Sequence, residues 1–173
     1  MKNSARLNRI SKKRACRIDN FFYKAAHYIV DFCLKNKVEV IDLATQQRTK
    51  SKEINLGSVN NQHFVSIPYT RFFWILTCVA AKAGIPVIET EESYTSKASL
   101  IDKDPIPVYK EGDRLEYHFS GKRISRGQYE SKEGTILNAD VNGAGNIIRK
   151  VYPNAFEGVT DFSYTNKTVI RVT

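Results

Sequence analysis

The chain has 173 residues, 42% hydrophobic and 11% aromatic, which suffices for one folded domain with a core and excludes intrinsic disorder. No apolar run reaches the roughly 18–20 residues of a membrane span, and no apolar segment of the secretory type follows the basic N-terminus. With 27 basic and 18 acidic residues the net charge is +9, which favours an acidic partner such as nucleic acid.

The first predicted element is a basic helix. Residues 4–35 predict one long helix or two short ones, because apolar residues recur at spacings of three and four from Phe21 to Leu34. Residues 2–17 contain no acid and seven basic residues, which are Lys2, Arg6, Arg9, Lys12, Lys13, Arg14 and Arg17. Such a cluster attracts phosphate backbones without reading sequence, so residues 1–37 are predicted to be a basic helical region that binds nucleic acid. The alternative is a solvated tail.

A strand, a buried helix and a second strand follow. Residues 38–44 are rich in β-branched side chains and predict a strand. Residues 70–83 predict a helix that is buried in the core together with Trp74. Residues 87–92 predict a short strand that ends in two acidic residues.

The remainder of the chain is more irregular. Residues 97–134 are rich in glycine and contain two prolines, which predicts an irregular insert with one β-hairpin. Residues 139–152 predict a helix, and the tail at 159–173 predicts one strand at 168–172. This order of helices and strands predicts the α/β fold class.

Three cysteines lie far apart, at Cys16, Cys33 and Cys78. They form no CxxC pair, so neither a zinc ribbon nor a disulfide framework is indicated. Unpaired cysteines in apolar helical patterns fit a reducing, cytoplasmic compartment.

Acidic residues fall at the edges of the predicted elements. Asp42 ends the first strand, Glu91 and Glu92 end the second, and Asp140 opens the last helix. Carboxylates that converge from strand ends and a helix start can bind Mg²⁺, and two such ions can activate water for phosphodiester hydrolysis. The alternatives are solvated acids at the strand ends, a favourable macrodipole interaction of Asp140, and a helix cap formed by Asn138.

The segment NADVNGAGNII, Asn138–Ile148, resembles the third RuvC motif of the transposon-encoded TnpB (OrfB-type) family of RNA-guided DNA nucleases. Three further segments are similar to that family in the same order. They are the basic helix with FFYKAAHYIVDFC, KEINLGSVNNQHFVSIPYTRFFWIL at Lys52–Leu76, and EESYTSKAS at Glu91–Ser99. On these four collinear segments the chain is identified as a member of the family, and the resemblance implies a partial RNase H-like (RuvC) core.

The resemblance also implies catalytic acids. Asp140 matches the third catalytic acid of the family, a metal ligand. The usual position of the second acid holds Ile41, and Glu92 best fits a shifted arrangement found in a subset of the family. Glu91 is its neighbour on the opposite face of the strand, and Asp42 is a weaker candidate. Glu92 and Asp140 are thus the expected Mg²⁺ ligands.

Two departures from the family pattern matter. Family members often carry two CxxC pairs in the insert, whereas here Lys97, Ala98 and Ser99 replace the first pair and no cysteine follows. The resemblance therefore implies a small cysteine-free, zinc-ribbon-like insert that holds no Zn²⁺. The family's first catalytic Asp lies in a Gly-x-Asp-Leu-Gly-type strand upstream of the matching segments, so the chain is expected to be N-terminally truncated.

The expected function is the C-terminal RuvC-like portion of a transposon-associated RNA-guided DNA endonuclease, nucleoid-associated and inactive alone because the first catalytic Asp is absent. DNA and guide RNA are the implied partners, and a second chain could supply the missing strand. The alternatives are a nuclease-dead RNA- or DNA-binding regulator and a non-functional transposon relic. Nucleic-acid contacts are expected from Lys12, Lys13, Arg14 and Arg17 and, unless they are merely solvated, from Lys122, Arg123 and Arg126. Tyr94 and Tyr129 are candidates for base stacking or for the core.

Overall fold

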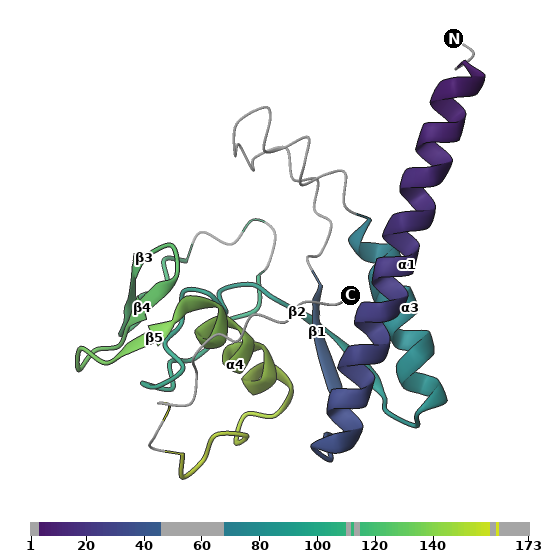
Figure 1. Cartoon of the computed structure of the whole chain (residues 1–173). Coiled ribbons are helices and arrows are strands. Elements are labelled where there is room, and N and C mark those ends of the chain that lie inside the picture. Colours follow the sequence, from purple (N-terminus) through teal and green to yellow (C-terminus); the bar gives the residue numbers. More distant parts are fainter. Residues whose placement is uncertain (1–3, 46–67, 110–111, 113–114, 160–161, 163–173) are drawn as a thin grey trace. The chain divides into compact units, whose positions relative to one another are not determined.

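The computed structural model describes residues 4–45, 68–109, 112, 115–159 and 162 (Figure 1). In these residues the fold is mixed α/β, with a two-stranded sheet and a three-stranded sheet. The elements are α1 (Ala5–Lys35), β1 (Ile41–Thr45), α3 (Tyr69–Lys82), β2 (Val87–Glu91), β3 (Lys122–Ser125), β4 (Gln128–Glu130), β5 (Ile136–Asn138) and α4 (Ala139–Val151). They divide into two compact units, one containing α1 and α3 and the other containing β3, β4, β5 and α4.

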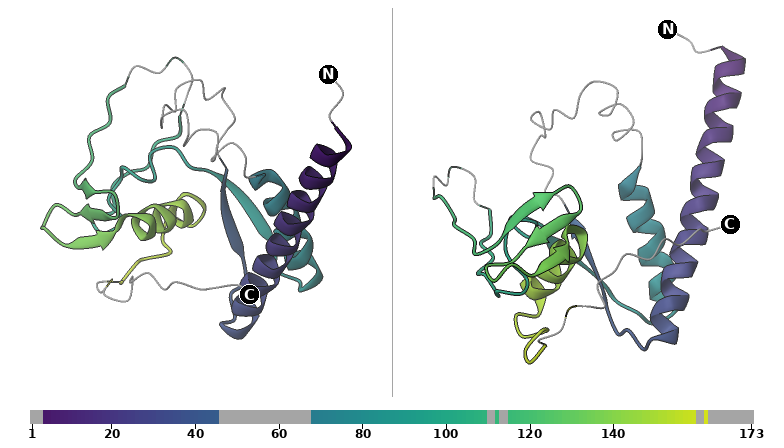
Figure 2. Two further views of the ribbon diagram at one scale, coloured as in Figure 1. Left: turned by 45° about the horizontal axis from the view of Figure 1, so that its top comes forward. Right: turned by 60° about the vertical axis from the view of Figure 1, so that its left-hand side comes forward.

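The first unit is a packed helix pair, visible as two neighbouring coils in both further views (Figure 2). The core is made by two short apolar stripes, Phe22, Ala26, Val30 and Cys33 of α1 with Ile75, Leu76, Val79 and Ala80 of α3. Phe22 and Phe72 place their ring centroids 5.2 Å apart. Arg71 donates to both carboxylate oxygens of Asp19 at 2.5 and 2.7 Å, which fixes the register of the pair.

The first half of α1 has no packing partner in the described part of the chain. Ser4 caps the helix by accepting from the backbone N–H of Leu7. Every residue from Ser4 to Arg17 is exposed, including the apolar Leu7 and Ile10. This segment, residues 4–17, is called the basic arm below. Among the described residues, its position is set by the continuation of the helix into the packed second half.

The second unit contains the antiparallel sheet β3-β4-β5. Tyr129 of β4 is 1% exposed, and its hydroxyl donates to the carbonyl of Lys97 at 2.7 Å. Burial raises the pKa of Tyr129 to about 12, with the charges of Asp104 and Asp102 adding to the effect. The phenol therefore stays a neutral donor that ties the sheet to the segment after β2.

Helix α4 contacts the same segment through the side-chain amides of two buried asparagines. Asn142 accepts from the N–H of Leu100 at 2.9 Å and donates to the carbonyl of Ala98 at 2.8 Å. Asn146 donates to the carbonyls of Thr95 and Ala98 at 3.0 and 2.7 Å. These bonds pair backbone groups of a turn that is not hydrogen-bonded within a sheet or helix. Because the groups are paired, the turn can be buried.

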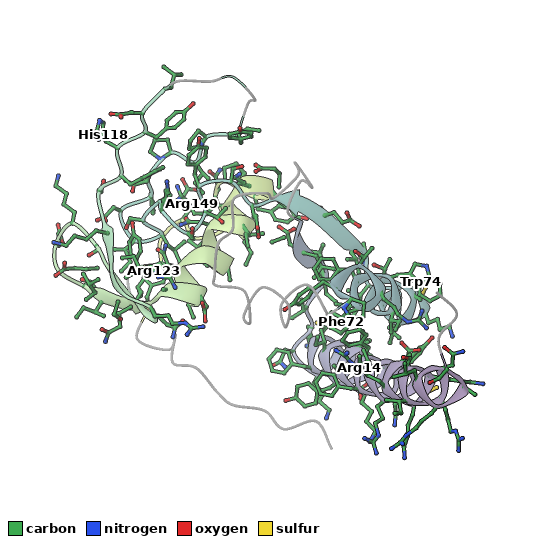
Figure 3. All side chains as sticks on the ribbon, turned by 90° about the horizontal axis from the view of Figure 1, so that it is seen from above. Arg14, Phe72, Trp74, His118, Arg123 and Arg149 are labelled. Atoms are coloured by element: carbon green, nitrogen blue, oxygen red, sulfur yellow. The ribbon has the colours of Figure 1, made fainter. Side chains whose placement is uncertain are left out.

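Most predicted elements are confirmed with boundaries shifted by one to three residues. Residues 5–35 form one helix, and the predicted hairpin is β3–β4. The prediction for Trp74 was wrong, since it is 63% exposed on the side of α3 that faces away from α1 (Figure 3). Tyr129 belongs to the core. The strand predicted at 168–172 lies outside the described residues.

No helix in the described ranges combines the length and the apolar character needed to cross a membrane.

The close packing of α4 can be tested at its two glycines. A Cβ on Gly145 would lie 2.9 Å from Cδ1 of the buried Leu100 and closer to Cδ2, whereas one on Gly143 meets nothing within 4 Å. We expect Gly145→Ala to destabilise the second unit by about 1–3 kcal/mol, the usual cost of overpacking a core. Gly143→Ala, the matched control, should stabilise it by about 0.5–1 kcal/mol because alanine favours the helix.

Hydrogen–deuterium exchange of the α4 amides measures both effects within the folded chain. Equal protection in the two variants would show that α4 does not pack tightly on Leu100.

Candidate catalytic acids and nucleic-acid interface

Glu91, at the end of β2, accepts hydrogen bonds from two other residues of the chain. Lys150 of α4 donates to its carboxylate at 2.7 Å and to its carbonyl at 3.1 Å. Ser93 donates from both its hydroxyl and its backbone N–H. Burial alone would raise the pKa of Glu91, but the hydrogen bonds from Lys150 and Ser93 outweigh it and hold the pKa below the usual 4.5.

Asp42 of β1 contacts Thr90, whose side chain lies on the face of β2 opposite to that of Glu91. Thr90 of β2 donates to Oδ1 of Asp42 on β1 at 2.6 Å. Side chains two apart on a strand share a face, so strand alternation predicts Glu92, just past the end of β2, on the side that Thr90 and Asp42 occupy. Among the described residues, Oδ2 of Asp42 is buried and accepts no hydrogen bond. Asp42 therefore offers one carboxylate oxygen that no donor among the described residues satisfies.

Asp140 opens α4 and is exposed. Asn138 caps the helix by accepting from the N–H of Asp140 at 2.9 Å and of Val141 at 3.4 Å, so the predicted cap is confirmed. Ten residues separate Asp140 from Lys150, which is about 15 Å along the helix axis. Because Lys150 reaches the end of β2, Asp140 lies about one helix length from that contact.

The donors fit a hard divalent cation, but their grouping is incomplete. Carboxylate oxygens suit Mg²⁺, which keeps several waters and needs only one or two protein carboxylates beside a phosphate. Within the described ranges, no three or more His, Cys, Asp or Glu residues come together closely enough to hold a metal ion. The pairing of Glu92 with Asp140 at Mg²⁺ remains a prediction.

The cysteine-free insert is joined to the turn after β2 by a buried carboxylate. Asp104 is 5% exposed and accepts from the N–H groups of Ser99 and Ser120 at 2.9 Å, and from the Ser120 hydroxyl at 2.5 Å. Arg149 of α4 donates to the Asp104 carbonyl at 3.0 Å. One side chain thus joins two segments that are 16 residues apart in sequence. Sequence reasoning missed this role of Asp104, because a single Asp in an irregular segment carries no pattern.

The predicted basic contacts divide into two kinds. Lys12, Lys13, Arg14 and Arg17 are exposed on the basic arm, where Figure 3 labels Arg14. In the hairpin, Lys122 forms an ion pair with Glu130 at 3.4 Å, and Arg123 donates to the carbonyls of Ser125 and Arg126. Arg126 is exposed. The arm is therefore the more available cationic surface.

Three rings gather where the chain leaves β2. Tyr94 lies 5.0 Å from Tyr117 in an edge-to-face pair and 6.2 Å from Phe119, measured between ring centroids. All three are half-buried. The sequence offered a weak sign of this group, since Tyr117 and Phe119 alternate with polar residues as on a strand.

The ion pair of Lys150 and Glu91 can be tested by its pH dependence. We expect Lys150→Met to lower stability by about 1 kcal/mol at neutral pH, a modest value because the pair is partly exposed to water. Glu91 has a lowered pKa in the folded state, so its contribution is present above its unfolded pKa and is lost as the pH falls through the folded value. The gap between wild type and variant should therefore close below about pH 4.5. Urea unfolding at a series of pH values measures it, and a gap that does not change with pH would contradict the assignment.

Comparison with known proteins finds two matches. Residues 69–147, from α3 into α4, match the family model described as the Cas12f1-like TNB domain. Among solved structures, the chain is similar to Cas12f1 in the cryo-EM structure of the Cas12f1–sgRNA–target DNA complex, with 19% sequence identity and a TM-score of 0.54. The match covers 83% of this chain and 36% of that chain. No match is found among the curated proteins.

The chain spans about a third of the length of that Cas12f1 chain, and at 19% identity the likeness establishes the fold. The family model matches independently and covers the turn after β2, the insert and the Asn142–Asn146 motif. These matches support a relation of the chain to the TnpB- and Cas12f-like proteins, and the family model assigns residues 69–147 to a Cas12f1-like TNB domain.

Proposed function

We propose that the chain is the C-terminal, RuvC-like portion of a transposon-associated RNA-guided DNA endonuclease and that it binds nucleic acid through the basic arm of α1. The observation that carries the binding proposal is the exposure of every residue from Ser4 to Arg17, a segment with six basic residues and no acid. An exposed cluster of one charge sign is the electrostatic footprint of a phosphate-binding surface.

The arrangement of the arm on the helix supports this role. At 100° per residue, Arg6, Arg9, Lys13, Arg14 and Arg17 fall within roughly 140° of one another around the axis. The α1 residues buried against α3 lie roughly on the opposite side of the same helix. A polyanion can therefore bind the arm without displacing α3.

Guide RNA and DNA are the proposed partners. The similar Cas12f1 structure is a complex with sgRNA and target DNA. The surplus of nine positive charges over the whole chain favours such polyanions at long range.

For the nuclease, we propose Glu92 and Asp140 as the Mg²⁺-binding acids of an RNase H-like (RuvC) core, which requires a rearrangement that brings Asp140 toward Glu92 from about one helix length away. The ion pair with Lys150 neutralises Glu91, whereas Asp42 keeps one buried oxygen without a partner and is the best additional ligand in the described residues. When bound, Mg²⁺ would supply an activated water and stabilise the leaving oxygen of a phosphodiester. Residues from another segment or chain would have to complete the site.

The second candidate function is a nuclease-dead RNA- or DNA-binding regulator. It is favoured by one observation, that the described residues hold no cluster of three metal-ligating side chains. The basic arm would serve this function equally well, so only the cleavage assay separates the two.

The binding proposal predicts a change in salt dependence. Replacing Lys12, Lys13, Arg14 and Arg17 by Gln should weaken RNA binding and reduce the slope of log K against log salt by about 0.7 for each phosphate that the arm no longer neutralises. Fluorescence anisotropy with a labelled single strand at several salt concentrations measures it. The control replaces four exposed lysines outside the arm by Gln, which are Lys35, Lys82, Lys103 and Lys132. Equal slopes in the two variants would rule out the arm as the binding surface.

The catalytic proposal predicts that the isolated chain does not cleave single- or double-stranded DNA in Mg²⁺, because a two-metal site needs an acid beyond Glu92 and Asp140. A gel assay over hours tests it, with Asp140→Ala as the background control. Cleavage that Asp140→Ala abolishes would show a complete site. In that case Glu92→Gln should be inactive and Glu91→Gln active if the assignment of the second acid is correct.

A further inference from the structure

We propose that a pocket of the second unit, beside Arg149 of α4, binds a small organic carboxylate with an apolar body. The pocket has a volume of about 470 Å³, which lies within the roughly 300–1,000 Å³ of small-molecule sites. All of its lining residues belong to the second unit, so one compact body forms it. The inference goes beyond the proposed nucleic-acid binding and does not depend on it.

Arg149 brings to this pocket a positive charge that no ion pair among the described residues neutralises (Figure 3). Its Nη1 donates to Oδ1 of Asn146 and its Nη2 to the carbonyl of Asp104, both at 3.0 Å, and both acceptors are neutral. A guanidinium has five N–H groups, so the others have no partner in the described part of the chain. Burial lowers the pKa of Arg149, although the group stays charged. A half-buried charge of this kind is stabilised by an anion that supplies the missing acceptors.

The other two charged residues of the lining neutralise each other. Lys150, whose side chain is 8% exposed, forms its ion pair with Glu91 at 2.7 Å. Two positive charges and one negative charge leave the lining with a net charge of +1, which matches a monoanion. A dianion would place surplus negative charge near Glu91. A carboxylate also fits the planar fork of Arg149, which can donate two parallel hydrogen bonds to it.

Four of the remaining lining residues are apolar and select the body of the ligand. They are Pro105, Ile106, Val108 and Pro153. The two proline rings hold φ fixed and carry no backbone N–H, so this wall is stiff and offers few donors. A nucleic-acid backbone matches it poorly, because a run of phosphates needs a row of cations. An apolar body that ends in one carboxylate satisfies both the wall and Arg149.

The experiment measures binding of naphthalene-2-carboxylate to the full chain by ligand-observed saturation-transfer NMR. A ligand of about a dozen non-hydrogen atoms should bind with a Kd of about 1 mM. Two comparison ligands separate its parts. The neutral alcohol 2-naphthalenemethanol keeps the body and should bind about tenfold or more weakly, because it lacks the charge. Inorganic phosphate keeps an anion without the body and should not displace the carboxylate at equal concentration.

The variants act on the pocket from two sides. Val108 is 58% exposed, so Val108→Asp should fold, and its carboxylate should weaken binding by about fivefold or more through repulsion. The neutral Val108→Asn should stay within about twofold of wild type, since it adds no charge. Lys132→Gln lowers the net charge by the same single unit outside the pocket and should match wild type.

Arg149→Met removes the cation and should weaken binding by about tenfold or more, with Arg149→Lys between it and wild type because a lysine keeps the charge without the fork. Arg149 also bonds to Asn146 and Asp104, so amide exchange of α4 verifies that Arg149→Met is folded. If it is not, the two Val108 variants decide.

Equal affinities for the carboxylate and the alcohol would overturn the carboxylate site, and so would displacement by inorganic phosphate or equal affinities of the two Val108 variants. Displacement of the carboxylate by saturating single-stranded RNA would also overturn it, because the pocket would then be part of a polyanion surface. Failure of the proposed function looks different. In that case RNA does not bind in a salt-dependent way, while the carboxylate still binds.

Discussion

Two buried asparagines of α4 hold the second unit together. Asn142 and Asn146 make four hydrogen bonds to backbone groups between Thr95 and Leu100, in a turn with no ladder of its own. A buried backbone polar group without a partner costs about 1–3 kcal/mol, so the turn can be buried only while α4 stays in place. Gly145, one turn along the same face as Asn142, lets the helix approach Leu100 closely enough for those bonds.

The position of the acids follows from this docking of α4. Lys150 near the C-terminal end of the docked helix reaches Glu91, while Asp140 at its first turn projects from the opposite end. The packing of α4 also gives Glu91 and Glu92 different surroundings. Glu91 is bound by Lys150 and Ser93, whereas strand alternation predicts Glu92 on the face that carries Asp42.

The sequence was most informative where a repeating pattern exists. The helices α1, α3 and α4 follow from apolar spacing and caps. The motif NADVNGAGNII pointed to the family through residues that are largely structural, above all the buried Asn142 and Asn146. Sequence reasoning failed for Trp74, because propensity and apolar character do not tell which side of a helix faces a partner. The role of Asp104 and the ring contacts of Tyr94 with Tyr117 and Phe119 depend on segments distant in sequence, which leave no periodic signal.

The hydrogen-bonded insert has a consequence for the conditions under which the protein keeps its shape. In a zinc ribbon, thiolates must stay reduced and metal must be supplied, so oxidants and chelators unfold it. Residues 79–173 contain no cysteine, and the link from the turn to the insert runs through the Asp104 carboxylate and its serine and backbone donors. This link contains no thiolate, so oxidation of a cysteine cannot break it, and it depends instead on keeping competing water away from Asp104 and its donors.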